Sequence, residues 1–339
     1  MDQLELKYKE TLAPSKQLIA DMAQTQGDIL ILGVAGKMGP SLAILARQAL
    51  DAAGLYDRKV IGVARFSTIK LKEMLESAGV ITLRADLLNE ADLASLPNAK
   101  NIIFMAGQKF GTTGKESFTW AMNSYLPGRI AEKYKESRIV VFSSGNIYPF
   151  TPICYGGACE RVTPEPIGEY AQSCLGRERI FQYHSDKYQT PMLIYRLNYA
   201  NDVSYGVLVE IAKSVIESRP IDLSMGNVNV IWQGDANEYA LRSLLHCESP
   251  ARLLNITGPE TTSVRWLAEE FGRLFEKVPV FSGEEKTTAL LNNAAESFEL
   301  FGYPKLPLKL MIKLIAEWII QQKPMLDKPT HFQEREGKF

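Results

Sequence analysis

A glycine-punctuated turn between an apolar run and a helix-like stretch constrains this chain most. Residues 28–43 read Asp-Ile-Leu-Ile-Leu-Gly-Val-Ala-Gly-Lys-Met-Gly-Pro-Ser-Leu-Ala, so Gly33, Gly36 and Gly39 recur at three-residue steps. This pattern is typical of a strand that passes through a tight turn into a helix whose N-terminus can hold a phosphate. The spacing differs from the commoner G-x-G-x-x-G of dinucleotide-binding proteins. Alone, the turn predicts a phosphate site and no particular reaction.

Composition and charge exclude several classes of partner. A formal net charge of -1 gives the 339-residue chain no general attraction to nucleic acid or to acidic membranes. Its apolar runs are shorter than the roughly 20 residues of a membrane helix, and residues 1–10 lack a signal-peptide core. We therefore expect a cytoplasmic protein. The four cysteines form no CxxC pair and the three histidines lie far apart, so we predict no metal site.

Apolar runs alternate with helix-like segments along most of the chain. The predicted strands cover residues 29–32, 59–64, 80–83, 101–106, 138–142, 192–195 and 253–256. Near-continuous apolar strands joined through helices indicate an α/β fold with a doubly wound parallel sheet of about seven strands, in which ligands bind beyond the carboxyl ends of the strands.

The same pattern suggests how the chain divides into parts. We expect a helical N-terminal extension packed on the main domain, a nucleotide-binding domain, a smaller substrate lobe that covers the cleft, and a loosely held polar tail. In that order, the parts are assigned to residues 1–27, to 28–200 with 226–258, to 201–225 with 259–320, and to 321–339.

Several motifs in order resemble those of the extended short-chain dehydrogenase/reductases, the NAD-dependent epimerase/dehydratase family. The resemblance covers roughly residues 28–320. The motifs are the glycine turn, Asp86-Leu87, Met105-Ala106-Gly107, Asn123, Phe142-Ser143-Ser144-Gly145-Asn146-Ile147-Tyr148, Tyr170, Leu254-Asn255-Ile256-Thr257-Gly258 and Ser263-Val264-Arg265-Trp266-Leu267. The resemblance implies an NAD(P)-dependent oxidoreductase or epimerase acting on a sugar-like or hydroxy-acid small molecule. By analogy with relatives, it also implies a homodimer.

The resemblance assigns catalytic roles to three residues. Tyr170 would be the acid/base, Ser144 would hold the same substrate oxygen, and Asn123 would support the geometry behind them. A phenol with a pKa near 10 needs a shift towards neutrality to act as a base at pH 7. In the family, a lysine four residues after the tyrosine supplies that shift and holds the nicotinamide ribose.

Cys174 stands where that lysine belongs. Three interpretations remain open: another residue, with Lys109 the nearest candidate by topology, does the work of the lysine; the chemistry needs no strongly activated tyrosine; or the protein binds cofactor with little turnover. A nucleophilic role for Cys174 is a fourth alternative, although most single cysteines on helices are packed thiols. In the third case, the chain is a cofactor-binding sensor or scaffold.

The cofactor would lie along the glycine turn and the neighbouring strand ends. Asp86 can accept a hydrogen bond from an adenine amino group, and small residues at 106–107 leave room for adenosine. Arg65 follows the second strand, where NAD-selective proteins usually carry an acid, and Lys37 lies within the turn. These two cations favour NADP over NAD. The predicted cofactor-binding residues are Gly33, Gly36, Lys37, Met38, Gly39, Arg65, Asp86, Leu87, Ala106 and Gly107.

The substrate side carries less signal. Polar residues after the fifth and sixth strands are candidate contacts, and ordinary loop packing explains them equally well. They are Asn146, Tyr148, Asn198 and Tyr199. Family members that dehydrate their substrate carry an Asp-Glu pair directly after the catalytic serine. Gly145 and Asn146 occupy that place here, which argues against such a dehydration.

Overall fold

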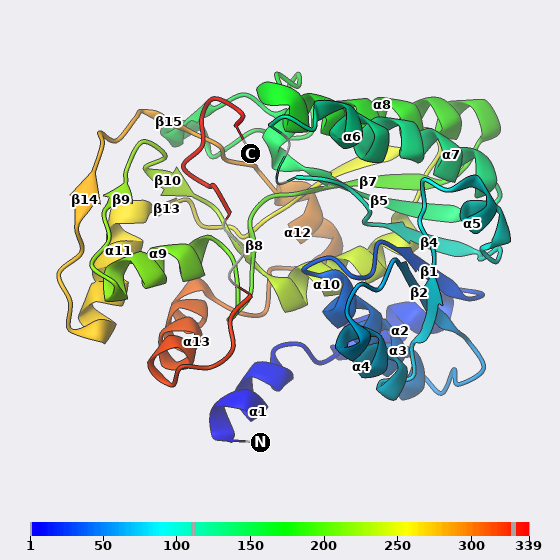
Figure 1. Ribbon diagram of the computed structural model, residues 1–339, viewed down its shortest axis with the longest axis horizontal. Coiled ribbons are helices and arrows are strands. Elements are labelled where there is room, and N and C mark those ends of the chain that lie inside the picture. Colours follow the sequence, from blue (N-terminus) through cyan, green and yellow to red (C-terminus); the bar gives the residue numbers. More distant parts are fainter. Residues whose placement is uncertain (1, 110, 112, 327–329, 339) are drawn as a thin grey trace.

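A parallel sheet of seven strands forms the main domain (Figure 1). The structure is a computed structural model that describes residues 2–109, 111, 113–326 and 330–338. The strands are β1 (Ile29–Leu32), β2 (Val60–Ala64), β3 (Ile81–Arg84), β4 (Asn101–Phe104), β5 (Arg138–Ser144), β7 (Met192–Leu197) and β12 (Arg252–Ile256). They lie in the order β12-β7-β5-β4-β1-β2-β3. The predicted doubly wound sheet is confirmed, and its strand order reverses between β1 and β4, where such sheets bind ligands.

Helices cover both faces of the sheet because its side chains alternate between two apolar layers. Ile29 and Ile31 face one layer with α2, α3 and α10, whereas Leu30 and Leu32 face the other with α7 and α8. The helices of this domain are α3 (Gly39–Ala52), α4 (Ile69–Ser77), α5 (Glu90–Ser95), α6 (Glu116–Trp120), α7 (Leu126–Lys133), α8 (Gly168–Tyr188), α10 (Gln233–Arg242) and α12 (Ala295–Phe301), with a π-helical turn at Ala121–Tyr125. Full burial of such an aliphatic side chain stabilises the fold by about 1.5–3 kcal/mol.

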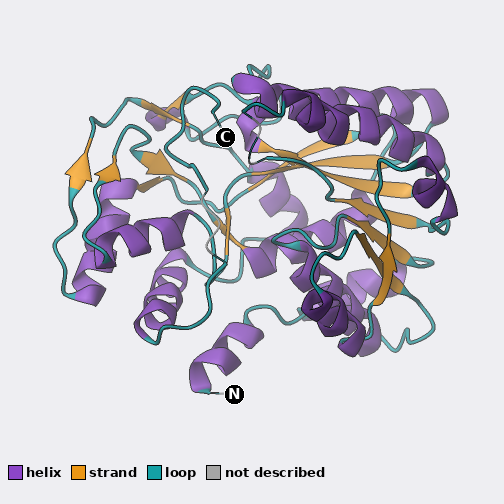
Figure 2. Ribbon diagram, in the orientation of Figure 1, coloured by secondary structure: helices purple, strands orange, loops and turns teal. Residues whose placement is uncertain are grey.

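A smaller lobe lies beside the carboxyl ends of the strands (Figure 2). Its helices are α9 (Val207–Ile216), α11 (Val264–Phe275) and α13 (Leu308–Ile320). Short strand pairs border it: β6 (Thr151–Pro152) with β15 (Thr288–Ala289), β8 (Ala200–Asn201) with β11 (Ile231–Trp232), β9 (Ile221–Asp222) with β14 (Phe281–Ser282), and β10 (Asn227–Val228) with β13 (Thr262–Ser263). Sequence analysis places 226–258 in the main domain, yet Val228, Val230 and Trp232 pack into the core of this lobe. Within the described part of the chain, no helix combines the length and apolar character needed to cross a bilayer.

The N-terminal extension contacts both parts of the molecule. Helix α2 (Lys16–Gln24) packs on α3 and α10 of the main domain, and α1 (Gln3–Glu10) packs on α13 of the smaller lobe. The Tyr8 hydroxyl donates to Asp202 at 2.7 Å, and the Tyr8 ring contacts the rings of both Trp232 and Trp318. The extension therefore connects the two parts as well as packing on the main domain.

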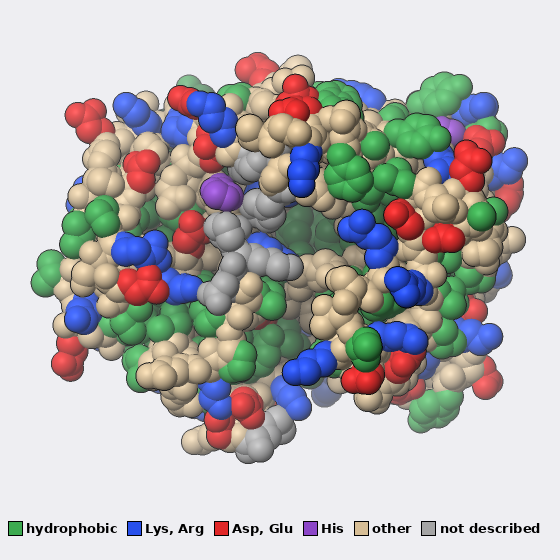
Figure 3. All heavy atoms as spheres, in the orientation of Figure 1, with side chains coloured by type: hydrophobic (Ala, Val, Ile, Leu, Met, Phe, Trp, Pro, Cys, Tyr) green, Lys and Arg blue, Asp and Glu red, His purple; other side chains and the backbone are tan. Residues whose placement is uncertain are grey.

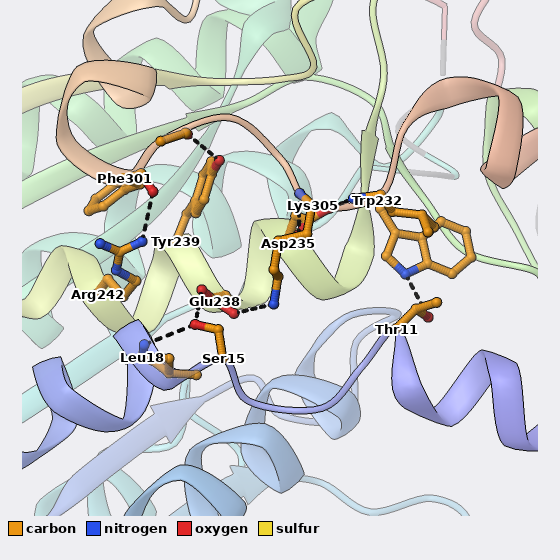
Figure 4. A network of polar contacts seen from close by, with 12 residues as sticks. Thr11, Ser15, Leu18, Trp232, Asp235, Glu238, Tyr239, Arg242, Phe301 and Lys305 are labelled. Carbon is orange, nitrogen blue, oxygen red and sulfur yellow. Dashed lines mark hydrogen bonds and ion pairs between the residues drawn. The ribbon is translucent and has the colours of Figure 1, made fainter.

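A polar network on α10 fixes the segment between α1 and α2 (Figure 4). Glu238 is buried, and its carboxylate accepts hydrogen bonds from Ser15 Oγ and Lys305 Nζ, both at 2.6 Å. Nearby, Trp232 Nε1 donates to Thr11 Oγ1 at 3.0 Å. Since a buried carboxylate left without partners is costly, these contacts fix the extension against the domain.

Candidate active site

A cavity of about 210 Å³ lies between the carboxyl ends of the strands and the smaller lobe. Figure 3 shows the face on which the molecule is hollowed between these two parts. Many of the predicted site residues line the cavity: Lys37, Met38, Lys109, Ser144, Asn146, Tyr170, Asn198 and Tyr199. The structure thus brings together residues from the glycine turn, from the ends of β4, β5 and β7, and from α8.

Contacts within the protein require a glycine at two of the three positions of the turn. Gly33 has φ +93°, and a Cβ there would lie 2.7 Å from the backbone nitrogen of Ala106. A Cβ on Gly39 would lie 2.2 Å from the carbonyl oxygen of Val34. Gly36 differs, because it is exposed and the nearest atom to its Cβ position is 3.5 Å away. A ligand that approaches the backbone at Gly36 explains this third glycine, so the turn fits a cofactor pyrophosphate.

The start of α3 adds donors and a positive charge to this cradle. Met38 caps the helix without a side-chain hydrogen bond, so the first-turn N–H groups lack the usual capping acceptor. Lys37 extends towards Tyr205, which packs into the core of the main domain, and its Nζ lies 5.2 Å from the centre of the Tyr205 ring. The turn thus presents a helix N-terminus and a lysine to the same cavity.

Tyr170 and Ser144 lie next to each other in the lining of the cavity, within hydrogen-bond reach. Ser144 ends β5, and its Oγ donates to Asn146 Oδ1 at 3.0 Å and accepts from the Asn146 N–H at 3.1 Å. Burial raises the pKa of Tyr170 well above its ordinary value, and Cys174 adds to the rise, while the charge of Arg177 and a hydrogen bond with Ser144 oppose it. At neutral pH the phenol is therefore protonated and able to donate to a substrate oxygen.

Lys109 approaches Tyr170 from the loop after β4. Its Nζ lies 5.5 Å from the centre of the Tyr170 ring. Burial, and then the charge of Lys37, lower the pKa of Lys109 to about 8, while Cys174 and Glu210 act in the opposite direction. A lysine with this pKa keeps its charge at neutral pH and favours the phenolate form of a nearby tyrosine.

Asn123 acts on the same loop without lining the cavity. It is fully buried in the π-helical turn; its Oδ1 accepts the Gln108 N–H at 2.9 Å, and its Nδ2 donates to the Gln108 carbonyl at 2.8 Å. These two bonds fix the backbone that carries Lys109. Asn123 is therefore a positioning residue in this structure.

Arg177, which the sequence analysis missed, places a buried charge behind Tyr170. Its Nη1 donates to the Phe142 carbonyl and its Nη2 to Asn123 Oδ1, both at 2.7 Å. It follows Tyr170 by seven residues, or two helical turns, on the same side of α8. That spacing is the signal that would have found it.

Some predicted contacts differ in the structure. Tyr148 is buried away from the cavity, where its hydroxyl accepts from Arg196 at 2.6 Å and donates to Asn255 at 2.9 Å; its predicted substrate contact is therefore wrong. The missing side chain at Gly107 makes room for Arg177 of the protein itself, because a Cβ there would lie 2.5 Å from Arg177 Nη2. Leu87 packs into the core of the main domain.

Two predicted cofactor contacts remain exposed at the strand ends. The Asp86 carboxylate accepts a hydrogen bond from the Leu88 N–H at 3.1 Å, and the Asp86 residue is exposed to solvent. Arg65 is exposed directly after β2. Ala106 is buried beside Gly33, as the close approach of β4 to the turn requires.

Cys174 is buried beside Tyr170. Burial raises the pKa of its thiol, although the charge of Arg177 and a bond with Tyr170 lower it in part. A protonated, buried thiol is a poor nucleophile. The geometry therefore disfavours the nucleophilic alternative for Cys174.

Solved structures share this architecture. A UDP-glucuronic acid 4-epimerase from Bacillus cereus, in complex with UDP-glucuronic acid and NAD, matches with a TM-score of 0.70 at 17% identity over 87% of this chain and 99% of that one. A UDP-glucose 4-epimerase from Thermotoga maritima, with UDP-glucose, gives the same values. A Thermus thermophilus UDP-glucose 4-epimerase, in complex with NAD, matches at 0.69 and 19% over 86% and 98%. The chain shares the fold of these epimerases.

No protein-family model and no curated protein sequence matches the chain. The matched structures are less than 20% identical to this chain but align over nearly their whole length, so they show a shared fold. The assignment of the site residues depends on the geometry of this chain alone. The fold that the sequence resemblance implied is thus confirmed.

Proposed function

We propose that the protein is an NAD(P)-dependent oxidoreductase or epimerase acting on a sugar-like or hydroxy-acid small molecule. The observation that carries the proposal is the meeting of Tyr170, Ser144 and Lys109 in one cavity beside the glycine turn. The solved NAD-containing epimerases of the same fold support it. Fluorescence titration with NADH and NADPH tests the proposal, and failure of both to bind would refute it.

Each residue has a defined task in the proposed reaction. A bound nicotinamide supplies the site that accepts or returns a hydride. As the phenolate, Tyr170 Oη would take the proton of the substrate hydroxyl while that hydroxyl becomes a carbonyl, and as the phenol it would give the proton back in the reverse step. Ser144 Oγ donates a hydrogen bond to the same oxygen, and the charge of Lys109 stabilises the Tyr170 phenolate. Asn123 and Arg177 keep these groups in position.

A cofactor-binding sensor or scaffold is the second candidate function. Cys174 supports it, because a neutral, buried thiol replaces the family lysine beside Tyr170. The two candidates differ in turnover. A measured rate that disappears in Tyr170→Phe would exclude the sensor, whereas tight NADH binding without any turnover would favour it.

We propose NADP as the preferred cofactor, with Arg65 as the only remaining argument. Lys37 lines the substrate cavity with Lys109, so it no longer supports the preference. We expect Arg65→Ala to weaken NADPH binding about tenfold and NADH binding much less, because a 2′-phosphate loses a cation. Calorimetric titration of both cofactors measures this, with the exposed Lys70→Ala as control. An equal effect on both cofactors would contradict the preference.

Gly36→Ala separates the cofactor cradle from protein stability. The new methyl group has room in the protein, since the nearest atom is 3.5 Å away, but it would meet an approaching pyrophosphate. We expect NADH affinity to fall about tenfold or more, a loss of about 1.4 kcal/mol, with little change in melting temperature. Gly39→Ala is the matched contrast, because its methyl group would collide with Val34 and destabilise the fold. Unchanged NADH affinity in Gly36→Ala would refute the cradle.

A further inference from the structure

The segment Thr330–Lys338, which the sequence analysis expects to be loosely held, is packed against the substrate lobe. Thr330 lines the cavity, and its N–H and its hydroxyl both donate to the Glu210 carboxylate, the N–H at 2.9 Å. Phe332 is only 1% exposed and lies in the core of the smaller lobe. This segment is therefore a fixed wall of the cavity.

Arg335 holds the middle of this wall. Its guanidinium lies 4.1 Å from the centre of the Phe150 ring. Its Nη1 donates to the carbonyls of Thr288 at 2.9 Å and Ser224 at 3.2 Å, and its Nη2 donates to Thr288 Oγ1 at 2.7 Å. Both terminal nitrogens are thus used by the protein, so they are committed to the wall instead of to a ligand phosphate.

The wall reaches the start of the helix that carries Tyr170. Gly168 begins α8, and a Cβ there would lie 2.4 Å from the Gly337 carbonyl oxygen. A Cβ on Gly337 would lie 2.4 Å from the Ile167 carbonyl oxygen. The two backbones approach this closely only because both residues are glycines, each with positive φ. The segment therefore spans from the smaller lobe to α8.

The cavity offers few charges for a phosphorylated substrate. Among the described residues that line it, the cationic side chains are Lys37, beside the cofactor cradle, and Lys109, beside Tyr170. Diphosphate recognition usually draws on several arginines, lysines or backbone donors. The other polar side chains that line it carry hydroxyls and amides, from Ser143, Ser144, Asn146, Tyr170, Asn198, Tyr199, Tyr205 and Thr330. Ser143, Asn198 and Thr330 already donate to Glu178, Asn229 and Glu210, so Ser144, Asn146 and Tyr170 are the groups best suited to substrate hydroxyls.

The size of the cavity also favours a substrate smaller than a nucleotide sugar. Its volume of about 210 Å³ must receive both the nicotinamide and the substrate. Pockets for drug-sized ligands measure about 300–1,000 Å³. The cavity lies below that range even before the nicotinamide is bound, which favours a compact substrate over a nucleotide joined to a sugar.

We propose that the substrate is a small polyhydroxy molecule, a free sugar or sugar acid, without a nucleotide, and that the wall formed by Thr330–Lys338 excludes nucleotide sugars. This inference rests on the proposed function. It separates the chain from the solved epimerases of the same fold, which were crystallised with UDP-sugars.

Saturation-transfer NMR on the full chain, loaded with whichever of NAD⁺ and NADP⁺ it binds more tightly, tests the proposal. The probes are D-glucose, D-gluconate and UDP-glucose. We expect transfer to the ring or chain protons of D-glucose or D-gluconate and none to the uracil protons of UDP-glucose. Transfer to uracil with a Kd below about 100 μM would overturn the exclusion of nucleotides. Absence of transfer to both free-sugar probes would overturn the polyhydroxy class.

Gly337→Ala and Lys338→Ala test the wall itself. The first change forces a methyl group into the Ile167 backbone, whereas Lys338 is exposed and pairs with Glu336. We expect Gly337→Ala to speed amide hydrogen exchange in residues 330–338 at least tenfold, and Lys338→Ala to leave it unchanged. Equal exchange in both variants would overturn the wall.

The outcomes also separate this inference from the proposed function. NADH titration of the same sample comes first. A chain that binds neither NADH nor NADPH refutes the proposed function, and the UDP-glucose experiment is then run on the unloaded chain. Uracil contact in a sample that binds NADH refutes only the exclusion of nucleotides.

Discussion

Tyr170→Phe is expected to lower kcat by about 100- to 10,000-fold, with KM and the melting temperature nearly unchanged. The change removes the hydroxyl that exchanges a proton with the substrate and keeps the ring that Lys109 contacts. The hydroxyl is also a hydrogen-bond partner of Ser144, but that serine keeps its bonds with Asn146. The measurement is the initial rate of NAD(P)H formation with a free sugar or sugar acid.

Tyr183→Phe is the matched control for this prediction. Tyr183 lies on the same helix, is exposed, and has Lys187 four residues later, with its Nζ 5.7 Å from the Tyr183 ring. It thus copies the Tyr-x-x-x-Lys spacing of the family at the end of α8 that lies away from the cavity. Full activity is expected in Tyr183→Phe. A loss of similar size in both variants would count against Tyr170 as the acid/base.

Lys109→Met is expected to lower kcat about 100-fold while raising the free energy of unfolding near neutral pH. The lowered pKa of Lys109, about 8, means that the folded protein holds this charge less readily than the unfolded chain, in which the pKa is near 10.5. Burial and the charge of Lys37 disfavour the charged ammonium group, and an uncharged methionine removes both of these unfavourable effects. The group proposed to activate Tyr170 is therefore expected to cost stability, as active-site groups often do.

The pH dependence gives this prediction a second readout. Between about pH 8 and 10.5, the unfolded chain binds more protons at Lys109 than the folded protein, so the wild-type free energy of unfolding gains from this group as the pH rises. Below pH 8 that gain is absent, and Lys109→Met is expected to exceed the wild type by the largest margin there. Urea unfolding at several pH values measures the difference. The exposed Lys115→Met is the control, and a less stable Lys109→Met would contradict the prediction.

Local sequence patterns were sufficient to predict the sheet. Each strand is a short apolar run, and the glycine turn marks where the first strand ends and the first helix of the sheet begins. Gly33 and Gly39 are required there by contacts with the adjacent β4 or with residues nearby in the sequence. Lys109 could also be predicted. The ends of β4 and β5 are neighbours in a parallel sheet, so the residues that follow them meet.

The directions of individual side chains could not be predicted from these patterns. Tyr148 lies only two residues beyond Asn146, but the 3₁₀ turn Gly145–Ile147 directs it into the core beside Arg196. From the sequence, Lys37 is a second candidate cation for a 2′-phosphate, but in the structure it lines the cavity and contacts Tyr205. Such directions depend on partners that lie far apart in the sequence.

The wall residues depend on still longer separations. Thr330 bonds to Glu210, 120 positions away, and nothing in the polar composition of its surroundings indicates that partner. Phe332 is an isolated aromatic residue, so it shows no periodicity that would mark it as part of a core. Contacts of this kind follow from the assembled lobe.

The N-terminal extension has a kinetic consequence. A rocking motion of the smaller lobe away from the sheet would strain the extension and oppose either the Tyr8–Asp202 bond or the Ser15–Glu238 bond, so we expect the cleft to resist wide opening. We therefore expect a dinucleotide bound in this cleft to leave slowly. Slow release hinders a dehydrogenase, which must exchange its spent cofactor after every turnover. It suits a reaction in which the hydride returns to the molecule that gave it up, because one resident cofactor then serves many cycles.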